Sequence, residues 1–331
     1  MNIAAFVWGA HPSSNYRAIH PLTELARRGH LIATYTEEAE LTPSDDDLAV
    51  VLEDFDVAYI GRYIQPEAVQ LARRLTAGGM GVVWDNDDDV VRPERRAGFD
   101  GMAEVVDVIT TTNEALAERY RSYGARTVMP IPNFLTRASL MAPRRKHDGI
   151  VLGYAGWIDH QDDWDALGLQ GIVEDLLDIH HDLHVESVGP IDLRLPSDCY
   201  RSQGVLPFDQ LPQAIAGFDV AIAPLIDKPG NDTRSDIKLK EYAIAGVPWL
   251  ASPYGPYVDY GEEQGGWLVE DDQWFDALNA LISDGKTRKK LAKRGQKWAK
   301  DQTLERNVGY WVEALEQAMA LAEERGAAAA A

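Results

Sequence analysis

The sequence predicts two doubly wound α/β domains, each built on a parallel β-sheet. Short, continuous apolar runs alternate with helical segments of ten or more residues along most of the chain. Continuous apolar runs are typical of strands that are buried on both faces of a sheet. The chain has 331 residues, which suggests two domains at roughly 100–200 residues each. A stretch rich in proline and arginine, residues 132–149, breaks the rhythm, and we place the interdomain linker there.

Six strands and the helices between them account for the first half. Helices are recognised by apolar residues three or four apart and by glycine at their C-terminal ends. The expected strands are residues 2–8, 31–36, 56–63, 81–84, 108–112 and 127–131. The expected helices are residues 14–30, 65–79 and 113–124.

The second half repeats this architecture without evident sequence similarity. Its expected strands are residues 150–156, 184–190, 220–225, 248–252 and 265–271. Its expected helices are residues 164–179, 208–219 and 235–246, followed by three more, of which the last covers about 303–324. Ser235 is a natural N-cap and Gly246 a natural stop for the helix between them. We expect one domain at 1–140, another at 149–302, the helix 303–324 as a candidate to pack back on the first, and a frayed alanine tail.

Charge and cysteine content limit the classes of partner and compartment. The formal net charge of −21 opposes general binding to nucleic acids or to anionic membranes. The basic segment 285–300 is best explained as the solvated face of a surface helix. A single cysteine, Cys199, excludes an internal disulfide and favours a reducing compartment. Because the N-terminus lacks a signal-peptide pattern and no run is long enough for a membrane helix, we expect a cytoplasmic protein.

One segment of the second half has the features of an anion site. The strand 220–225 is followed by a loop and then by the helix that starts at Ser235, where unpaired backbone N–H groups can bind an anion. Arg234 and Lys238 add positive charge, which suits a diphosphate. Glu241 lies three residues after Lys238, on the same helix face, and could accept hydrogen bonds from a ribose diol. A capped helix with a Lys238–Glu241 surface pair explains the same spacing.

This segment resembles the donor-binding region of GT-B fold glycosyltransferases of group 1, the family 4-like transferases. The match covers a strand ending in proline, a loop with asparagine, a Ser-x-x-Lys-x-x-Glu-Tyr helix and a strand ending in Ala-Ser. The matching residues are Pro224, Asn231, Ser235, Lys238, Glu241, Tyr242, Gly246, Pro248, Ala251 and Ser252. The similarity continues through residues 150–164 and 265–299, and it is looser in the first half.

The resemblance implies a GT-B fold in which residues 149–302 bind a nucleotide sugar and residues 1–140 bind the acceptor. The residues that it places around the donor are Gly153, Gly156, His160, Asp163, Asn231, Arg234, Ser235, Asp236, Lys238 and Glu241. It also implies retention at the anomeric carbon and catalysis without a metal ion or other cofactor. One departure is that Thr233 occupies a position, eight before Glu241, where the family commonly has glutamate near the transferred sugar.

The candidates on the acceptor side follow strands of the first half. His11 and Asp87 are candidate catalytic residues, although a solvated loop histidine is the simpler explanation of His11. The acceptor-side candidates are Tyr16, Arg17, Asp85, Asp88 and Asn113. Four aspartates within residues 85–89 suggest a metal site at first sight. We expect instead that nearby arginines, Arg92, Arg95 and Arg96, neutralise the last two.

We therefore expect a metal-independent glycosyltransferase that uses a nucleotide sugar. The acceptor is left open among a glycan, a small molecule, a protein and a modified nucleobase. Two alternatives share the fold: a non-hydrolysing nucleotide-sugar epimerase, and a donor-binding protein that has lost its activity, which the Thr233 departure allows.

Overall fold

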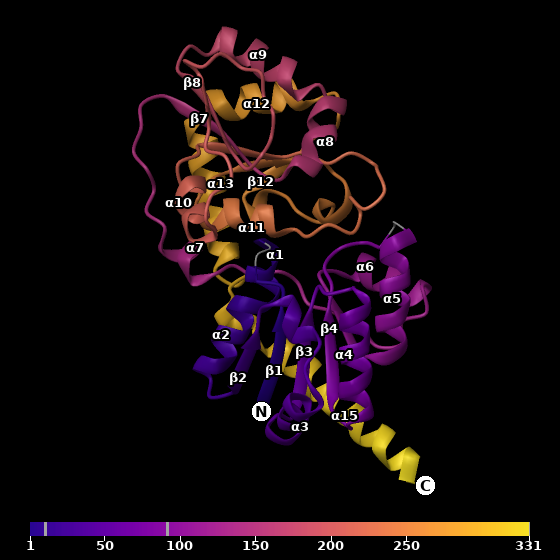
Figure 1. The fold of residues 1–331 in the computed structure, drawn as a ribbon. Helices are drawn as coiled ribbons and strands as arrows, with labels where there is room; N and C mark the ends of the chain where they lie inside the picture. Colours follow the sequence, from indigo (N-terminus) through magenta and orange to yellow (C-terminus); the bar gives the residue numbers. More distant parts are fainter. Residues whose placement is uncertain (10–11, 91–92, 331) are drawn as a thin grey trace. The chain divides into compact units, whose positions relative to one another are not determined.

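The computed structural model describes residues 1–9, 12–90 and 93–330, which divide into two compact units. Unit 1 consists of Met1–Asn133, Thr233–Ser235 and Leu304–Ala331. Unit 2 consists of Phe134–Asp232 and Asp236–Thr303. Figure 1 shows that each unit has a central sheet with helices on both sides.

Unit 1 contains a six-stranded parallel sheet, as the apolar runs predict. In sheet order its strands are β2 (Leu31–Tyr35), β1 (Asn2–Val7), β3 (Val57–Gly61), β4 (Gly81–Asp85), β5 (Val108–Thr111) and β6 (Val128–Pro130). The chain moves outward from β1 to β2 and then returns to place β3 on the other side of β1. The topological switch point of unit 1 therefore lies between β1 and β3, beyond whose carboxyl ends such folds bind ligands.

The helices of unit 1 include two, α3 and α5, that the sequence analysis did not predict. The helical segments are α1 (Pro12–Ser14), η1 (Asn15–Ile19), α2 (His20–Arg27), η2 (Glu38–Leu41), α3 (Asp45–Asp54), α4 (Pro66–Ala77), α5 (Pro93–Val105), α6 (Glu114–Ser122), α14 (Leu304–Asn307) and α15 (Gly309–Ala330). The first expected helix is present as α1, η1 and α2 in succession, and η1 is a π-helical turn.

Helix α15 packs against β3, β4 and β5. It approaches β4 so closely that a Cβ atom at Gly81 would lie 2.7 Å from the carbonyl carbon of Ala318. The helix continues through Ala330, so the expectation of a frayed alanine tail is wrong. Alanine has the highest helix propensity of all residues, which allows the helix to extend to that point.

A buried ion pair joins η1 to β4 inside unit 1. Arg17 is 1% exposed and Asp85 is 0% exposed, and Nη2 of Arg17 lies 2.6 Å from Oδ1 of Asp85. The hydroxyl of Thr110 also donates a hydrogen bond to that oxygen, at 2.6 Å. Burial alone would lower the pKa of Arg17, but the Asp85 carboxylate outweighs burial and raises it. We predicted both residues on the acceptor side; their complete burial gives them a structural role instead.

Unit 2 contains a second six-stranded parallel sheet, with one strand, β9, that the sequence analysis missed. In sheet order its strands are β12 (Gly266–Leu268), β11 (Trp249–Ala251), β10 (Val220–Ala223), β7 (Ile150–Ala155), β8 (Leu183–Val188) and β9 (Tyr200–Ser202). Strands β8 and β9 extend the sheet on one side of β7, and β10, β11 and β12 extend it on the other. The switch point of unit 2 therefore lies between β7 and β10.

The helices of unit 2 differ from prediction at several points, one of which is a short helix at residues 137–141, within the expected linker. They are α7 (Arg137–Met141), η3 (Ile158–His160), α8 (Gln161–Ala166), α9 (Leu169–Ile179), η4 (Phe208–Gln210), α10 (Leu211–Ile215), α11 (Ile237–Ile244), η5 (Gly255–Tyr257), η6 (Glu262–Gln264), α12 (Trp274–Ser283) and α13 (Gly285–Ala299). The helix expected at 164–179 is divided by Gly168, which has a φ of 61°. Helix α11 begins at Ile237 with Asp236 at the N-cap position, so the assignment of Ser235 as N-cap is wrong. No helix in the described part of the chain is long and apolar enough to cross a bilayer.

We predict that Arg17→Met destabilises the protein by about 3–5 kcal/mol, because it leaves the Asp85 carboxylate buried without a counterion. Urea denaturation measures the change. Arg27→Met is the matched control, since Arg27 forms only an exposed pair with Glu24 and should cost less than about 1 kcal/mol. Equal effects of the two substitutions would contradict the role of the buried pair.

Candidate functional site

A lysine and a glycine meet at the carboxyl end of β7, at the switch point of unit 2. Lys238, in the first turn of α11, places its Nζ 5.0 Å from the ring centroid of Tyr154 and 3.4 Å from its hydroxyl. A Cβ atom at Gly156 would lie 2.2 Å from the Tyr154 hydroxyl and 2.9 Å from Lys238 Nζ. Only glycine fits there, and the backbone at residue 156 therefore lies directly beside a positive charge.

Three further predicted residues, His160, Asp163 and Asn231, form a buried network. Nδ1 of His160 lies 2.8 Å from Oδ2 of Asp163, and Nδ2 of Asn231 donates to Oδ1 of Asp163 at 2.8 Å. The backbone N–H of Ile226 and the ammonium of Lys228 also approach Oδ1, at 3.2 and 3.3 Å. The network connects the start of α8 to the loop between β10 and α11.

Asp163 is held in its charged form. Burial acts to raise the pKa of this carboxyl, but the hydrogen bonds from His160 and Asn231 outweigh burial and lower it. The lowered pKa favours the Asp163 carboxylate, which fixes the orientation of His160 and Asn231. We infer that it shapes the loop after β10, which leads into α11.

Gly153 has a packing role that the resemblance did not indicate. A Cβ atom at this position would lie 2.0 Å from the ring of Phe218, in the core of unit 2. The resemblance implied that Gly153 and Gly156 both let the backbone approach a donor. In the structure Gly156 lies beside Lys238, whereas the missing side chain of Gly153 makes room for Phe218.

The remaining donor-side candidates are placed in different surroundings. Arg234 and Ser235 group with unit 1, where Asn113 donates to the carbonyl oxygens of Thr233 and Arg234 at 3.1 and 2.8 Å. Asp236 belongs to unit 2, where its carboxylate binds the ammonium of buried Lys240 at 2.9 Å and the hydroxyl of Tyr260. Glu241 lies within α11 and is 7% exposed. Of the predicted diphosphate ligands, Lys238 is therefore the one that unit 2 itself supplies.

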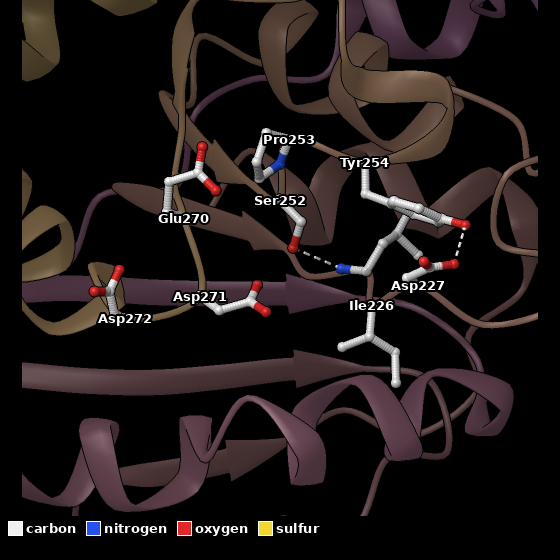
Figure 2. Close-up of a pocket in the computed structure, with 9 residues that line it drawn as sticks. Ile226, Asp227, Ser252, Pro253, Tyr254, Glu270, Asp271 and Asp272 are labelled. Carbon is white, nitrogen blue, oxygen red and sulfur yellow. Dashed lines mark hydrogen bonds between the residues drawn. The ribbon is translucent and has the colours of Figure 1, made fainter.

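Unit 2 also has an acidic pocket of about 380 Å³ at the carboxyl ends of β10, β11 and β12. Figure 2 shows the residues around it, in which Tyr254 donates to Asp227 at 2.7 Å and Ser252 accepts from the Leu225 N–H at 2.9 Å. The pocket is lined by Leu225, Ile226, Asp227, Ser252, Pro253, Tyr254, Glu270, Asp271 and Asp272. With four carboxylates and no basic group in its lining, it disfavours a phosphate.

In unit 1 the aspartates that follow β4 each have an arginine partner. Besides the Arg17–Asp85 pair, Arg62 binds Asp87 and Asp88, each at 2.5 Å. Arg95 also binds Asp88, at 3.2 Å, and Arg119 binds Asp89. Of the three arginines that we expected here, Arg95 pairs with the cluster, Arg96 pairs with Asp100, and Arg92 lies outside the described residues. In the described ranges no group of three or more His, Cys, Asp or Glu side chains is arranged to hold a metal ion.

The surroundings of Asp87 disfavour its ionised form. Burial, together with the nearby Asp88 and Asp85 carboxylates, raises its pKa to about 6, although Arg62 acts in the opposite direction. Tyr16, in η1, is half-buried. His11, the other catalytic candidate, lies outside the described residues.

Comparisons with known proteins find similarity at the level of structure. No protein-family model matches the sequence, and no curated protein does. Solved structures match nearly the whole chain. HepE from Anabaena, in complex with UDP and glucose, is 14% identical, with 95% of this chain and 98% of that chain covered and a TM-score of 0.68. The chain has the GT-B fold.

Two further structures support this fold. Sucrose-phosphate synthase from Thermosynechococcus elongatus is 13% identical, covers 97% of this chain and 99% of its own, and has a TM-score of 0.70. WaaG, a glycosyltransferase involved in lipopolysaccharide biosynthesis, is 11% identical, with 95% and 99% covered and a TM-score of 0.66. The predicted resemblance to GT-B glycosyltransferases is thus confirmed for the fold, in both halves of the chain.

Within this GT-B fold, two residues of interest were missed in the sequence. Tyr154 was missed because it lies within an apolar run that predicts a buried strand, and nothing in that run indicates a contact with Lys238. Arg62 follows β3 directly, where a ligand-facing residue is expected in such sheets, so its position alone could have identified it. Its acidic partners lie 25 and 26 residues further along the chain, beyond the reach of local spacing.

We predict that Gly153→Ala destabilises the protein by about 1–3 kcal/mol, because the new methyl group overpacks the Phe218 ring. Gly171→Ala is the control: it lies in α9 with no atom within 4 Å of the new Cβ and should be neutral or stabilising by up to about 1 kcal/mol. Chemical denaturation compares the two variants. A stable Gly153→Ala protein would contradict the packing role.

We predict that Asp87→Asn gains stability relative to the wild type as the pH rises from 4 to 7. The folded-state pKa of Asp87 is raised from 3.8 to about 6, so the stability it contributes is complete below pH 4 and is lost as the pH rises through 6. Asparagine cannot ionise and escapes this loss. Melting temperatures at the two pH values measure the difference, with Asp175→Asn, on the exposed face of α9, as background. A difference that does not grow with pH would show that Asp87 ionises normally.

Proposed function

We propose that this protein is a glycosyltransferase that moves a sugar from a nucleoside-diphosphate sugar to a hydroxyl-bearing acceptor. The observation that carries the proposal is the arrangement of Lys238, Tyr154 and Gly156 at the switch point of unit 2. It lies where a doubly wound sheet binds its ligand, in a fold shared along 95% of the chain with a protein solved with UDP and glucose.

The leaving group of this reaction is a nucleoside diphosphate, whose negative charge grows as the bond to the sugar breaks. Lys238 supplies a positive charge, and the start of α11 supplies backbone N–H groups, for that charge. The glycine at 156 lets the phosphates approach the backbone beside Lys238. The acidic pocket over β10–β12 repels phosphates and so favours their placement on the β7 side. Glu241 is our candidate for the ribose hydroxyls.

We extend the proposal to its chemistry and its partners. Lys238 and the start of α11 would stabilise the negative charge of the leaving diphosphate, as a divalent cation does in metal-dependent transferases, so we propose a metal-independent reaction. We also propose retention at the anomeric carbon, as the resemblance implies. The acceptor contributes a hydroxyl group, which a glycan, a small molecule, a protein or a modified nucleobase can each supply. Asp87, with its raised pKa, is the candidate that meets this hydroxyl.

We predict that UDP raises the melting temperature of the wild-type protein and that Lys238→Ala weakens UDP binding about tenfold or more, since a hydrogen bond to a charged group contributes about 1.5–3 kcal/mol. Glu241→Ala should also weaken the binding of UDP. Isothermal titration calorimetry measures the affinities, and GDP, ADP and dTDP test the choice of base.

Lys290→Ala is the matched control, because Lys290 is an exposed lysine of α13 that pairs with Glu262. It should leave the affinity unchanged. If none of the four nucleotides binds, or if Lys238→Ala and Lys290→Ala behave alike, the site assignment fails. Binding of UDP without turnover of any sugar nucleotide would instead favour a donor-binding protein that has lost activity.

A further inference from the structure

Arg62 has a backbone conformation that side chains rarely adopt. Its φ is 58°, and it is the one non-glycine residue with a positive φ in the described part of the chain. It directly follows β3, and its N–H donates to the carbonyl oxygen of Asp85 at 2.7 Å. A non-glycine residue in this region persists only when its surroundings hold it there, and such residues cluster at functional sites.

The side chain of Arg62 is also incompletely satisfied. It is 6% exposed, with Nη1 bound to Asp87 Oδ1 and Nη2 bound to Asp88 Oδ2, each at 2.5 Å. Its Nε is buried and has no hydrogen-bond partner among the described residues. An unsatisfied buried donor is unfavourable. Arg62 therefore pairs with both aspartates, while its Nε remains without a hydrogen-bond partner among the described residues.

Arg62 binds one of the two carboxylate oxygens of Asp87 and leaves the other. Arg62 occupies Oδ1 of this carboxylate, whereas Oδ2 accepts no hydrogen bond from any described residue. The carboxylate is thus fixed at one oxygen and available at the other. Both residues lie just beyond the ends of neighbouring strands, β3 and β4, and Arg62 borders the switch point between β1 and β3. Ligands bind at this place in doubly wound sheets.

We propose that Arg62 is a positioning residue, which holds Asp87 so that Oδ2 accepts a hydrogen bond from the acceptor hydroxyl. The inference rests on the proposed glycosyltransferase function and deepens it on the acceptor side. The hydrogen bond fixes the orientation of the acceptor hydroxyl, and orientation of a reacting group accounts for a large part of catalytic rate.

The charges around Asp87 define how it should titrate. Arg62 and Arg17 favour its ionised form, and Asp88 and Asp85 oppose it. Tyr59 in β3 and Tyr120 in α6 lie near enough for Asp87 to influence them; the pKa values of both tyrosines are raised, mainly by burial. Their hydroxyls donate to the carbonyl oxygens of Arg17 and Asp88. Removal of the Arg62 charge should therefore raise the pH at which Asp87 ionises.

The test measures turnover of the sugar nucleotide that best stabilises the wild type among UDP-, GDP-, ADP- and dTDP-glucose, with water as acceptor. For Arg62→Gln we expect kcat to fall about 10- to 100-fold, the donor KM to stay unchanged, and the acid limb of the pH–rate profile to move to higher pH. Arg62→Lys should restore part of kcat and of the profile. Arg95→Gln is the matched control, because Arg95 binds Asp88 but not Asp87, and it should keep the wild-type kcat.

An active wild type with the same kcat and acid limb in Arg62→Gln would overturn the role of Arg62, as would equal effects of Arg62→Gln and Arg95→Gln. If Arg62→Gln does not fold, the test compares kcat of the double variant Arg62→Lys, Asp87→Asn with kcat of Asp87→Asn alone. The lysine substitution should have no further effect on kcat there, and a full additional loss would overturn the inference. A wild type that turns over none of the four donors overturns the proposed function itself, and this inference with it.

Discussion

The buried pair of Arg17 and Asp85 is the interaction on which unit 1 depends. The guanidinium of Arg17 binds Asp85 in β4. It also donates to the carbonyl oxygens of Ile131, just after β6, and of Thr111, the last residue of β5. The carbonyl oxygen of Arg17 accepts from the hydroxyl of Tyr59 and from the indole of Trp311 in α15. One residue of the π-helical turn thus connects strands and the C-terminal helix, and a charge buried in this way requires all of its partners.

Comparison with this pair also explains why the aspartates at the end of β4 and just after it differ from one another. Asp85 is enclosed and fully paired, so it serves the fold. Asp87, two residues later, emerges at the carboxyl end of the sheet, where one arginine binds one of its oxygens. The aspartate at position 85 therefore contributes stability, whereas the aspartate at position 87 provides a titratable carboxylate with one oxygen available. Burial and the number of partners make the difference, not the aspartate motif itself.

The sequence predicted what depends on local pattern and missed what depends on distant partners. Continuous apolar runs identified both parallel sheets, since burial on two faces leaves a direct compositional mark. The counterions of the aspartate cluster were sought in Arg92, Arg95 and Arg96 because these are near in sequence. In the structure Arg62 and Arg119, about 25–30 residues away, hold most of that role. The predicted start of α11 at Ser235 was wrong because the prediction used only the general N-cap preference of serine. In the structure the Ser235 hydroxyl accepts a hydrogen bond from Asn133, which is distant in sequence.

The sheet of unit 2 separates charge along its carboxyl ends, and this separation bears on how a sugar nucleotide would lie. Lys238 stands over the β7 end, whereas Asp227, Glu270, Asp271 and Asp272 surround the pocket over β10–β12. A diphosphate placed at the pocket would meet four like charges, and at Lys238 it would meet an opposite one. Since Coulomb energies are stronger at a partly buried site than in bulk water, this difference favours placement of the phosphates of the proposed donor on the β7 side. The fold provides the switch point, and under the proposed function the distribution of charge along the sheet favours the β7 end for the diphosphate.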